Sequence, residues 1–158
     1  MVLKYRVSLP GLKGFARVYE VKPTTSLYSL HKQMRADMDF PQDQVVLFKA
    51  FDAAGNVAAR YSVFQDFGLG TIDSVTVAEC HKRGEDKFIY FYDTTNVKSV
   101  IVTFDGEGVE KPLAIYPLLV ETTTVVMSLL FQAYNLKVLP LKLNVKKKFK
   151  QITKEKKL

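Results

Sequence analysis

The stretch that decides the fold is "KFIYFYDTTNVKSVIVTF", residues 87–104, which predicts two strands joined by a tight turn. The segment "FIYFY" is apolar on both faces of the first strand, a pattern typical of a central strand covered on two sides. The tip "DTTN" consists of good turn formers, so a plain turn is favoured over a polar binding surface. A base-stacking platform would need exposed rings beside Lys or Arg. Only Lys87 and Lys98 are near in sequence, so core packing is favoured for these aromatic residues.

Alternation at period two predicts further strands on both sides of this stretch. Residues 3–9 and 15–21 form one predicted hairpin around "GLKG", and "VVLFKAFD" and "VAARYSV" form a second. Between them, apolar residues recur at spacings of three and four, which predicts a single amphipathic helix over residues 26–38. A short helix is favoured for "VTVAECHKRG", although its β-branched start also suits a strand. "LAIYPLLV" is the last apolar segment before residue 121.

These elements predict an α+β fold, a two-layer sandwich in which a mostly antiparallel sheet packs on one main helix plus a short second helix. The argument is that a single amphipathic helix must bury its apolar stripe against a sheet. The opening order of hairpin, helix and strand is β-grasp-like and resembles ubiquitin in layout only. The predicted domain spans residues 1–120, followed by an apolar segment and a lysine-rich tail over residues 121–158.

The positive charge of the chain is concentrated in that tail. The 158 residues carry a net charge of +7. Residues 137–158 contain nine Lys and one Glu, which gives +8, so the other residues have 14 Lys and Arg against 15 Asp and Glu, which gives −1. Lysines near phosphates release counterions and bind nucleic acid without sequence preference. The candidate nucleic-acid contacts are Lys142, Lys146, Lys147, Lys148, Lys150, Lys154, Lys156 and Lys157.

Other interpretations of residues 121–158 stay open. The tail can be a solvated, disordered extension, or the product of a shifted reading frame, since Glu codons read one base out of frame become Lys-rich. A membrane span is not expected, because "TTTVVMSLLFQAYNL" offers 15 uncharged residues where about 20 are needed. An exposed apolar stretch of this length would favour aggregation, so residues 122–136 are expected to pack against something.

Four short motifs occur in a recognisable order over residues 3–104: "YRVSL", "LYSLHKQM", "DQVVLF" and "FIYFYD". In order and spacing they resemble the plasmid pRiA4b ORF-3-like family. The resemblance implies a compact α+β protein, often encoded on plasmids or beside transposable elements, with no established biochemical activity.

The sequence departs from that family at the positions where its members carry more polar chemistry. The family continues from its Tyr-Asp pair into Phe-Gly-Asp and then a Trp and a His, whereas Tyr92-Asp93 is followed here by "TTNVKS". Gln44 stands where the family tends to have a His. Tyr92, Asp93 and His31 therefore mark a degenerate family motif, and a metal or ligand site built on the usual motif is not expected here.

No catalytic, cofactor-binding or metal-ligating residues are predicted. A zinc site needs about four ligands, usually in close pairs, and the sequence offers one Cys and two His, with Cys80 and His81 adjacent. No nucleophile elbow or phosphate-cradling loop occurs. Acidic pairs such as Glu85-Asp86 are expected to be solvated surface carboxylates.

The sequence therefore predicts a non-catalytic binding or accessory module without a cofactor. Its partner is expected to be an unidentified protein, with nonspecific nucleic-acid binding through the basic tail as the alternative and a membrane partner not expected. An enzyme with an unrecognised site is the least favoured reading. The absence of a signal-peptide pattern and the single Cys80 favour the cytoplasm. A link to mobile genetic elements comes from the family resemblance alone.

Overall fold

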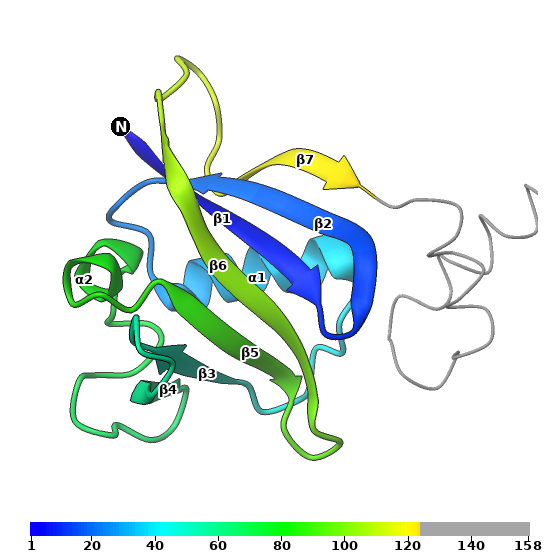
Figure 1. The fold of residues 1–158 in the computed structure, drawn as a ribbon, viewed down its shortest axis with the longest axis vertical. Coiled ribbons are helices and arrows are strands. Elements are labelled where there is room, and N and C mark those ends of the chain that lie inside the picture. Colours follow the sequence, from blue (N-terminus) through cyan, green and yellow to red (C-terminus); the bar gives the residue numbers. More distant parts are fainter. Residues whose placement is uncertain (124–158) are drawn as a thin grey trace, which may run out of the picture.

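The computed structural model describes residues 1–123, and residues 124–158 lie outside the described part. Within residues 1–123 the elements are β1 (Val2–Leu9), β2 (Leu12–Val21), α1 (Leu27–Met38), β3 (Leu47–Phe51), β4 (Val57–Ser62), α2 (Val77–Lys82), β5 (Lys87–Asp93), β6 (Lys98–Gly108) and β7 (Leu118–Thr123). The strands form one sheet in the order β4-β3-β5-β6-β1-β2-β7 (Figure 1). All neighbouring pairs in this sheet are antiparallel.

The two-layer sandwich predicted from the sequence is wrong. Within residues 1–123, strands account for 45% and helices for 15%, so a seven-stranded antiparallel sheet with two short helices defines the fold of this part. The physical reason is that α1 is shorter than the sheet is wide. The 12 residues of α1 span about 18 Å, whereas seven strands side by side are about 29 Å across. The β-grasp likeness ends with the order of the first elements, because β1 lies between β2 and β6 and is antiparallel to both.

Side-chain caps define where the two helices begin. The Ser26 hydroxyl accepts the N–H of Ser29 at 3.1 Å, in front of α1. At α2, the Thr76 hydroxyl accepts the N–H of Glu79 at 3.2 Å and donates to its carboxylate at 3.2 Å. Such caps satisfy backbone donors that have no partner within the helix. Ser26 and Thr76 also form a β-bridge, so the starts of both helices are joined.

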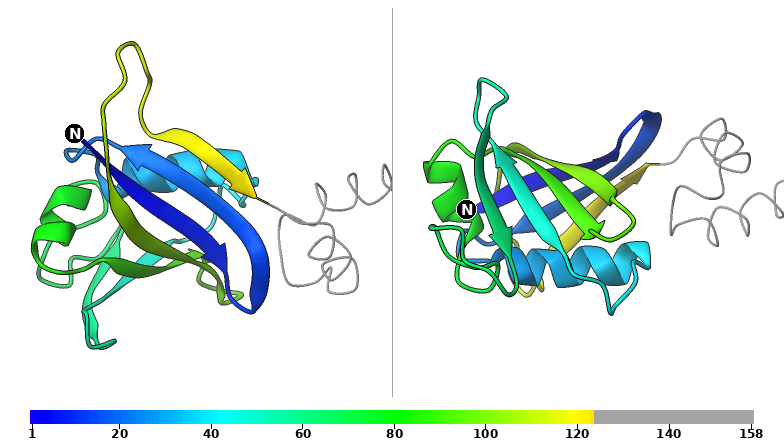
Figure 2. Two further views of the ribbon diagram at one scale, coloured as in Figure 1. Left: turned by 45° about the horizontal axis from the view of Figure 1, so that its top comes forward. Right: turned by 90° about the horizontal axis from the view of Figure 1, so that it is seen from below.

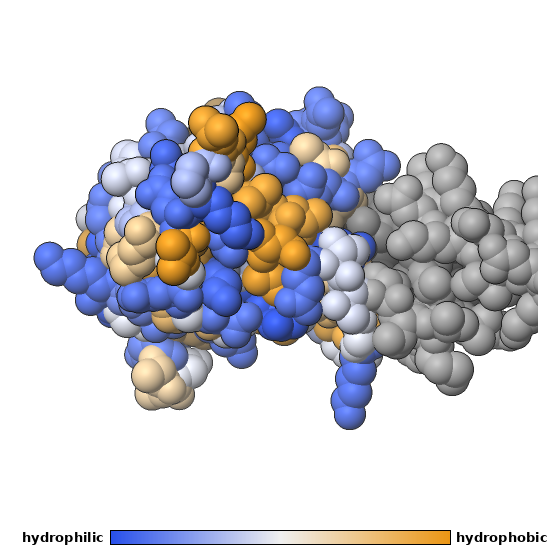
Figure 3. Space-filling model, turned by 90° about the horizontal axis from the view of Figure 1, so that it is seen from above, coloured by the Kyte–Doolittle hydropathy of each residue, from blue (hydrophilic) through white to orange (hydrophobic). Residues whose placement is uncertain are grey.

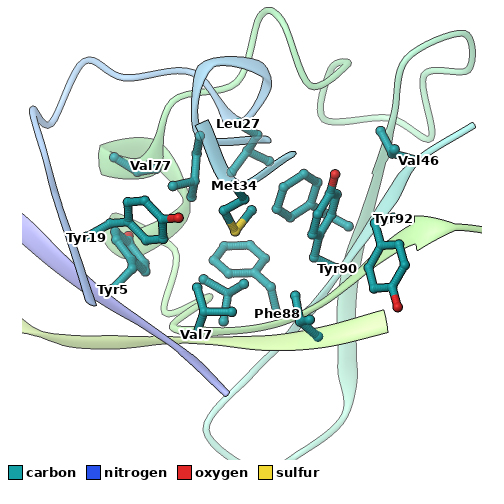
Figure 4. Packing of buried hydrophobic residues seen from close by; sticks show 14 of the residues in the cluster. Tyr5, Val7, Tyr19, Leu27, Met34, Val46, Val77, Phe88, Tyr90 and Tyr92 are labelled. Atoms are coloured by element: carbon teal, nitrogen blue, oxygen red, sulfur yellow. The ribbon is translucent and has the colours of Figure 1, made fainter. Parts of the chain in front are cut away.

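The core lies between the helices and one face of the sheet. In α1, Leu27, Leu30, Met34 and Met38 are buried against aromatic residues of the strands. Figure 4 shows Met34 pointing among the rings of the cluster. The fully buried aromatic side chains are Tyr5, Tyr19, Phe48, Tyr61, Phe88, Tyr90 and Tyr92. Aromatic side chains of this size each remove a large apolar surface from water when buried.

The opposite face of the sheet has no helix over it within residues 1–123. In Figure 1, α1 lies behind the strands, and Figure 2 shows it on one side of the sheet. The burial of β3 and β5 alternates along each strand, as expected for a sheet with one packed face. Ile89 and Phe91 are only half-buried, whereas Phe88 and Tyr90 are fully buried. The sequence-based expectation that this strand is covered on both sides is therefore wrong.

Candidate functional site

The open face of the sheet brings together side chains that are far apart in the sequence. We use the name open face for the outward residues of β4, β3, β5, β6 and β1. Strand register aligns them in three cross-strand rows. The rows are Arg60, Lys49, Ile89, Ile101 and Ser8; Phe51, Lys87, Thr103 and Arg6; and Leu47, Phe91 and Ser99. Together the rows contain basic, apolar and hydroxyl side chains, in contrast to the apolar core on the other face.

Two half-buried aromatic rings on the open face each lie beneath a lysine. The Lys49 Nζ atom is 5.8 Å from the ring centroid of Phe91, and the Lys87 Nζ atom is 5.9 Å from that of Phe51. Both distances are within the range of cation–π attraction. The lysines come from neighbouring strands, since Lys49 of β3 is opposite Ile89 of β5, two positions from Phe91. Half-buried rings beside cations, which the sequence did not indicate, are therefore present here.

The charge of the open face is uneven. Arg6, on β1, pairs with Asp105 at 3.4 Å and Glu121 at 3.9 Å. Within residues 1–123, no acidic side chain pairs with Arg60, Lys49 or Lys87. The half of the face over β4, β3 and β5 is therefore a cationic surface interrupted by aromatic rings.

A pocket of about 310 Å³ adjoins this cationic half at one end of the sheet. It is lined by Phe51, Asp52, Ala53, Gly84, Asp86, Lys87, Thr103 and Phe104. Behind it, the His81 Nδ1 atom is 2.6 Å from an Asp86 carboxylate oxygen, and the His81 ring stacks on Phe104 at 4.1 Å. Phe51, Lys87 and Thr103 of the open face therefore also line this pocket, where the carboxylates of Asp52 and Asp86 add negative charge.

Glu85, next to this pocket, is a buried carboxylate. Only 2% of it is exposed. It accepts a hydrogen bond from the Arg83 Nε atom at 2.8 Å and another from the Tyr61 hydroxyl. Arg83 also donates to the Tyr61 oxygen at 2.6 Å. The expectation of a solvated surface carboxylate at Glu85 is therefore wrong, because partners on β4 and at the end of α2 compensate for its burial.

Cys80 is buried beside the same network and is not positioned as a nucleophile. Its environment raises the pKa of the thiol to about 12, first through burial and then through the nearby Glu85 carboxylate. A thiol rather than a thiolate is therefore present at neutral pH, and thiols are poor nucleophiles.

The degenerate family motif does not form a polar site. His31 is 4% exposed and is hydrogen-bonded to the Tyr90 hydroxyl. The Tyr92 ring stacks on Phe40 at 3.9 Å, and its buried hydroxyl has no hydrogen-bond partner in the described structure. These contacts place both side chains in the core.

The third motif residue, Asp93, is bonded to its own turn. Its two carboxylate oxygens accept the Asn96 backbone N–H at 3.1 Å and the Asn96 side-chain amide at 2.8 Å. These bonds, the side-chain amide first, lower the pKa of Asp93. The carboxylate thus stabilises the turn between β5 and β6.

The connection between β6 and β7 is a second exposed feature. It projects from the sheet in Figures 1 and 2, and Figure 3 views the molecule from that side, where hydrophobic patches lie among hydrophilic side chains. Val109, Leu113 and Ile115 in this connection are exposed. The neighbouring charges are Glu110, which pairs with Lys22 at 3.3 Å, and Lys111. Because both signs of charge are present, this surface does not favour a positively or a negatively charged partner.

The eight candidate lysines of the tail lie outside the described residues. The apolar residues 122–136 also lie outside them, except for Thr122 and Thr123, which belong to β7. β7 crosses the domain boundary predicted at residue 120. Among residues 1–123, no helix is long and apolar enough to cross a membrane. The same residues contain no group of three or more His, Cys, Asp or Glu side chains arranged to hold a metal ion.

Comparison with known proteins identifies the fold and nothing further. No protein-family model and no curated protein matches this chain. A crystal structure of a protein of unknown function from Methanosarcina mazei Go1 is similar, with a TM-score of 0.68 and 18% sequence identity. The similarity covers 91% of this chain and 86% of that protein. The two proteins therefore share a fold over most of their lengths.

Proposed function

We propose that this chain is a non-catalytic binding module whose partner docks on the open face of the sheet. The observation that supports this proposal is the pairing of cations with half-buried rings on a face that no helix of residues 1–123 covers. Such a surface has the means to attract and hold a partner, whereas the buried His31, Cys80 and Glu85 are inaccessible to a substrate.

The sequence motifs "LYSLHKQM" and "FIYFYD" support a further part of the proposal. They suggest a diverged relative of the plasmid pRiA4b ORF-3-like proteins, and hence a cytoplasmic role associated with mobile genetic elements. The alternative function is nonspecific nucleic-acid binding through the lysines of residues 142–157, which the concentration of charge in that segment favours.

A photocrosslinking experiment in cells tests whether the open face is a binding surface. A photoreactive phenylalanine analogue replaces Thr103, which is exposed on the open face, in the full-length chain. The matched control places the same analogue at Ala36, which is exposed on α1 behind the sheet. We expect crosslinked products from position 103 and not from position 36. Sensitivity of the products to nuclease or to protease identifies the class of partner.

Equal yields at both positions, or no product at position 103, would contradict the proposal. The same experiment with the eight tail lysines changed to Gln separates the two functions. Products that persist in this background depend on the open face, and products that disappear depend on the tail.

A further inference from the structure

We propose that the open face binds single-stranded nucleic acid, with bases stacking on Phe51 and Phe91 and with Lys49, Lys87 and Arg60 contacting phosphates. This inference rests on the proposed function and names the partner of the same surface. It differs from binding through the basic tail, because every residue that it uses lies within residues 47–91 of the folded sheet.

The two rings are placed for separate bases. Phe51 is opposite Lys87, and Phe91 is opposite Leu47, so the rings are four residues apart along neighbouring strands. Strand dimensions put them about 14 Å from each other. Stacked bases in a helix are about 3.4 Å apart, so the two rings cannot hold neighbouring stacked bases, and each takes a base from a different part of the strand. Aromatic residues on open sheets bind unpaired bases in this way because every base has a π face.

The charges of the open face favour a polyanion over a protein partner. Lys49 lies on β3, in the middle of the cationic half of the face, between Arg60 and Ile89. Lysine is depleted in the core of protein–protein interfaces, because its charge must be desolvated there. A nucleic-acid strand supplies a phosphate for each of these cations. The lysine over each ring lies on a flexible stem, so it can turn to a phosphate and leave the ring accessible to a base.

A duplex does not fit the same residues. Its bases are paired inside and stacked on each other, so its outer surface offers phosphates to Lys49 and Lys87 and no base to Phe91. A duplex would therefore gain binding free energy from its phosphate contacts with the cations and none from stacking on the rings. The pocket next to Lys87 also limits where phosphates lie, because Asp52 and Asp86 line it and repel them. The strand's backbone is thus expected along β4, β3 and Lys87 of β5, outside the pocket itself.

The test measures binding by fluorescence anisotropy in a salt series. The protein is the full-length chain with the eight tail lysines changed to Gln, so that the tail does not contribute. The probes are a mixed-sequence oligonucleotide of about 16 nucleotides, as single-stranded RNA, as single-stranded DNA and as a DNA duplex. We expect tighter binding of both single strands than of the duplex, with affinity falling as salt rises.

Two variants separate stacking from charge. Phe91→Leu keeps an apolar side chain but removes the aromatic ring, and we expect it to weaken single-strand binding by about 5- to 150-fold. Lys49→Gln should weaken binding and reduce the salt slope by about 0.7. The matched controls are on α1, where the Lys32 Nζ atom lies 5.5 Å from the Tyr28 ring centroid. Tyr28→Leu and Lys32→Gln should leave the dissociation constant unchanged within about twofold.

Near-ultraviolet circular dichroism and a urea midpoint establish that each variant is folded, and Phe51→Leu replaces Phe91→Leu if the latter is not. Binding that Lys49→Gln weakens and the ring variants do not would overturn the inference while leaving the open face as a charged binding surface. Equal affinity for duplex and single strands would overturn it as well. If no probe binds, the inference fails, and the crosslinking at position 103 still decides the proposed function independently.

Discussion

His31 is a titratable side chain held in the core, against the hydroxyl of Tyr90. Burial, with a smaller effect from Arg35 and Lys32, lowers its pKa from 6.5 to about 4. Between these two values the unfolded chain binds a proton at this position and the folded chain does not. The free energy of unfolding should therefore fall on acidification, by about 1–2 kcal/mol between about pH 7 and about pH 5. Urea unfolding at the two pH values measures this loss.

Two variants assign the pH dependence to burial of the imidazole. His31→Gln lacks the titrating ring, so the loss of stability between the two pH values should shrink. Tyr90→Phe removes only the hydrogen-bond partner, and the buried imidazole should keep most of the pH dependence. An unchanged pH dependence in His31→Gln would show that other groups cause it.

At the residue scale, the sequence predicted side chains that obey local patterns and missed those whose partners are distant. The turn from Asp93 to Asn96 follows from neighbouring residues in the sequence. The burial of Glu85 depends on Tyr61, 24 positions away. The proximity of Lys49 to Phe91 depends on which strand lies beside β3 and on the register between the two strands. A short stretch of sequence specifies neither.

The loop between β4 and α2 is held by one carboxylate and one glycine. Asp66 accepts the N–H groups of Gly68 at 2.7 Å and Gly70 at 3.0 Å. Gly70 has a φ of +108°, and a Cβ atom there would lie 2.8 Å from the Ser74 hydroxyl oxygen and 2.9 Å from a Val75 methyl group. The loop therefore has no room for a side chain at this position.

We expect Gly70→Ala to lower the free energy of unfolding by about 2–4 kcal/mol, because it adds steric overlap to backbone strain. The matched control is Gly55→Ala, where φ is +86° and nothing lies within 4 Å of the added atom. Strain alone should then cost about 1 kcal/mol. Urea midpoints of the two variants test the difference, and equal losses would show that the overlap at position 70 is relieved by movement of Ser74 and Val75.

At the scale of elements, the periodicity of apolar residues predicted the helix and the first strands well. It did not predict how far the sheet extends or which of its faces is covered. The hairpin at residues 3–21 and the helix at 26–38 correspond to β1, β2 and α1, since alternation and the spacing of Leu27, Leu30, Met34 and Met38 report directly which side is buried. The same periodicity says nothing about the extent of a sheet. "LAIYPLLV" was an apolar segment without a partner, and only the structure shows part of it pairing with β2 as β7.

The whole molecule contains a single cysteine, and the fold shields it. Cys80 is buried in α2, and its environment raises the pKa of the thiol to about 12. Reaction with a disulfide reagent therefore requires opening of the fold, and we expect labelling of the native protein to be more than about a hundredfold slower than in urea. The control carries Cys80→Ala with Thr103→Cys on the open face and should react at once. Rapid labelling of the unmodified chain would show that α2 detaches readily.

The strand order has a consequence for how the protein is made. β1 and β2 are synthesised before the other strands of the sheet, and their sheet neighbours β6 and β7 follow about 100 residues later. At about 5–20 residues per second, translation leaves both edges of the first hairpin unpaired for roughly 5–20 s. An unpaired strand edge attracts other extended chains. A nascent chain of this protein is thus most exposed to mispairing, and most dependent on chaperones, while residues 22–97 are being translated.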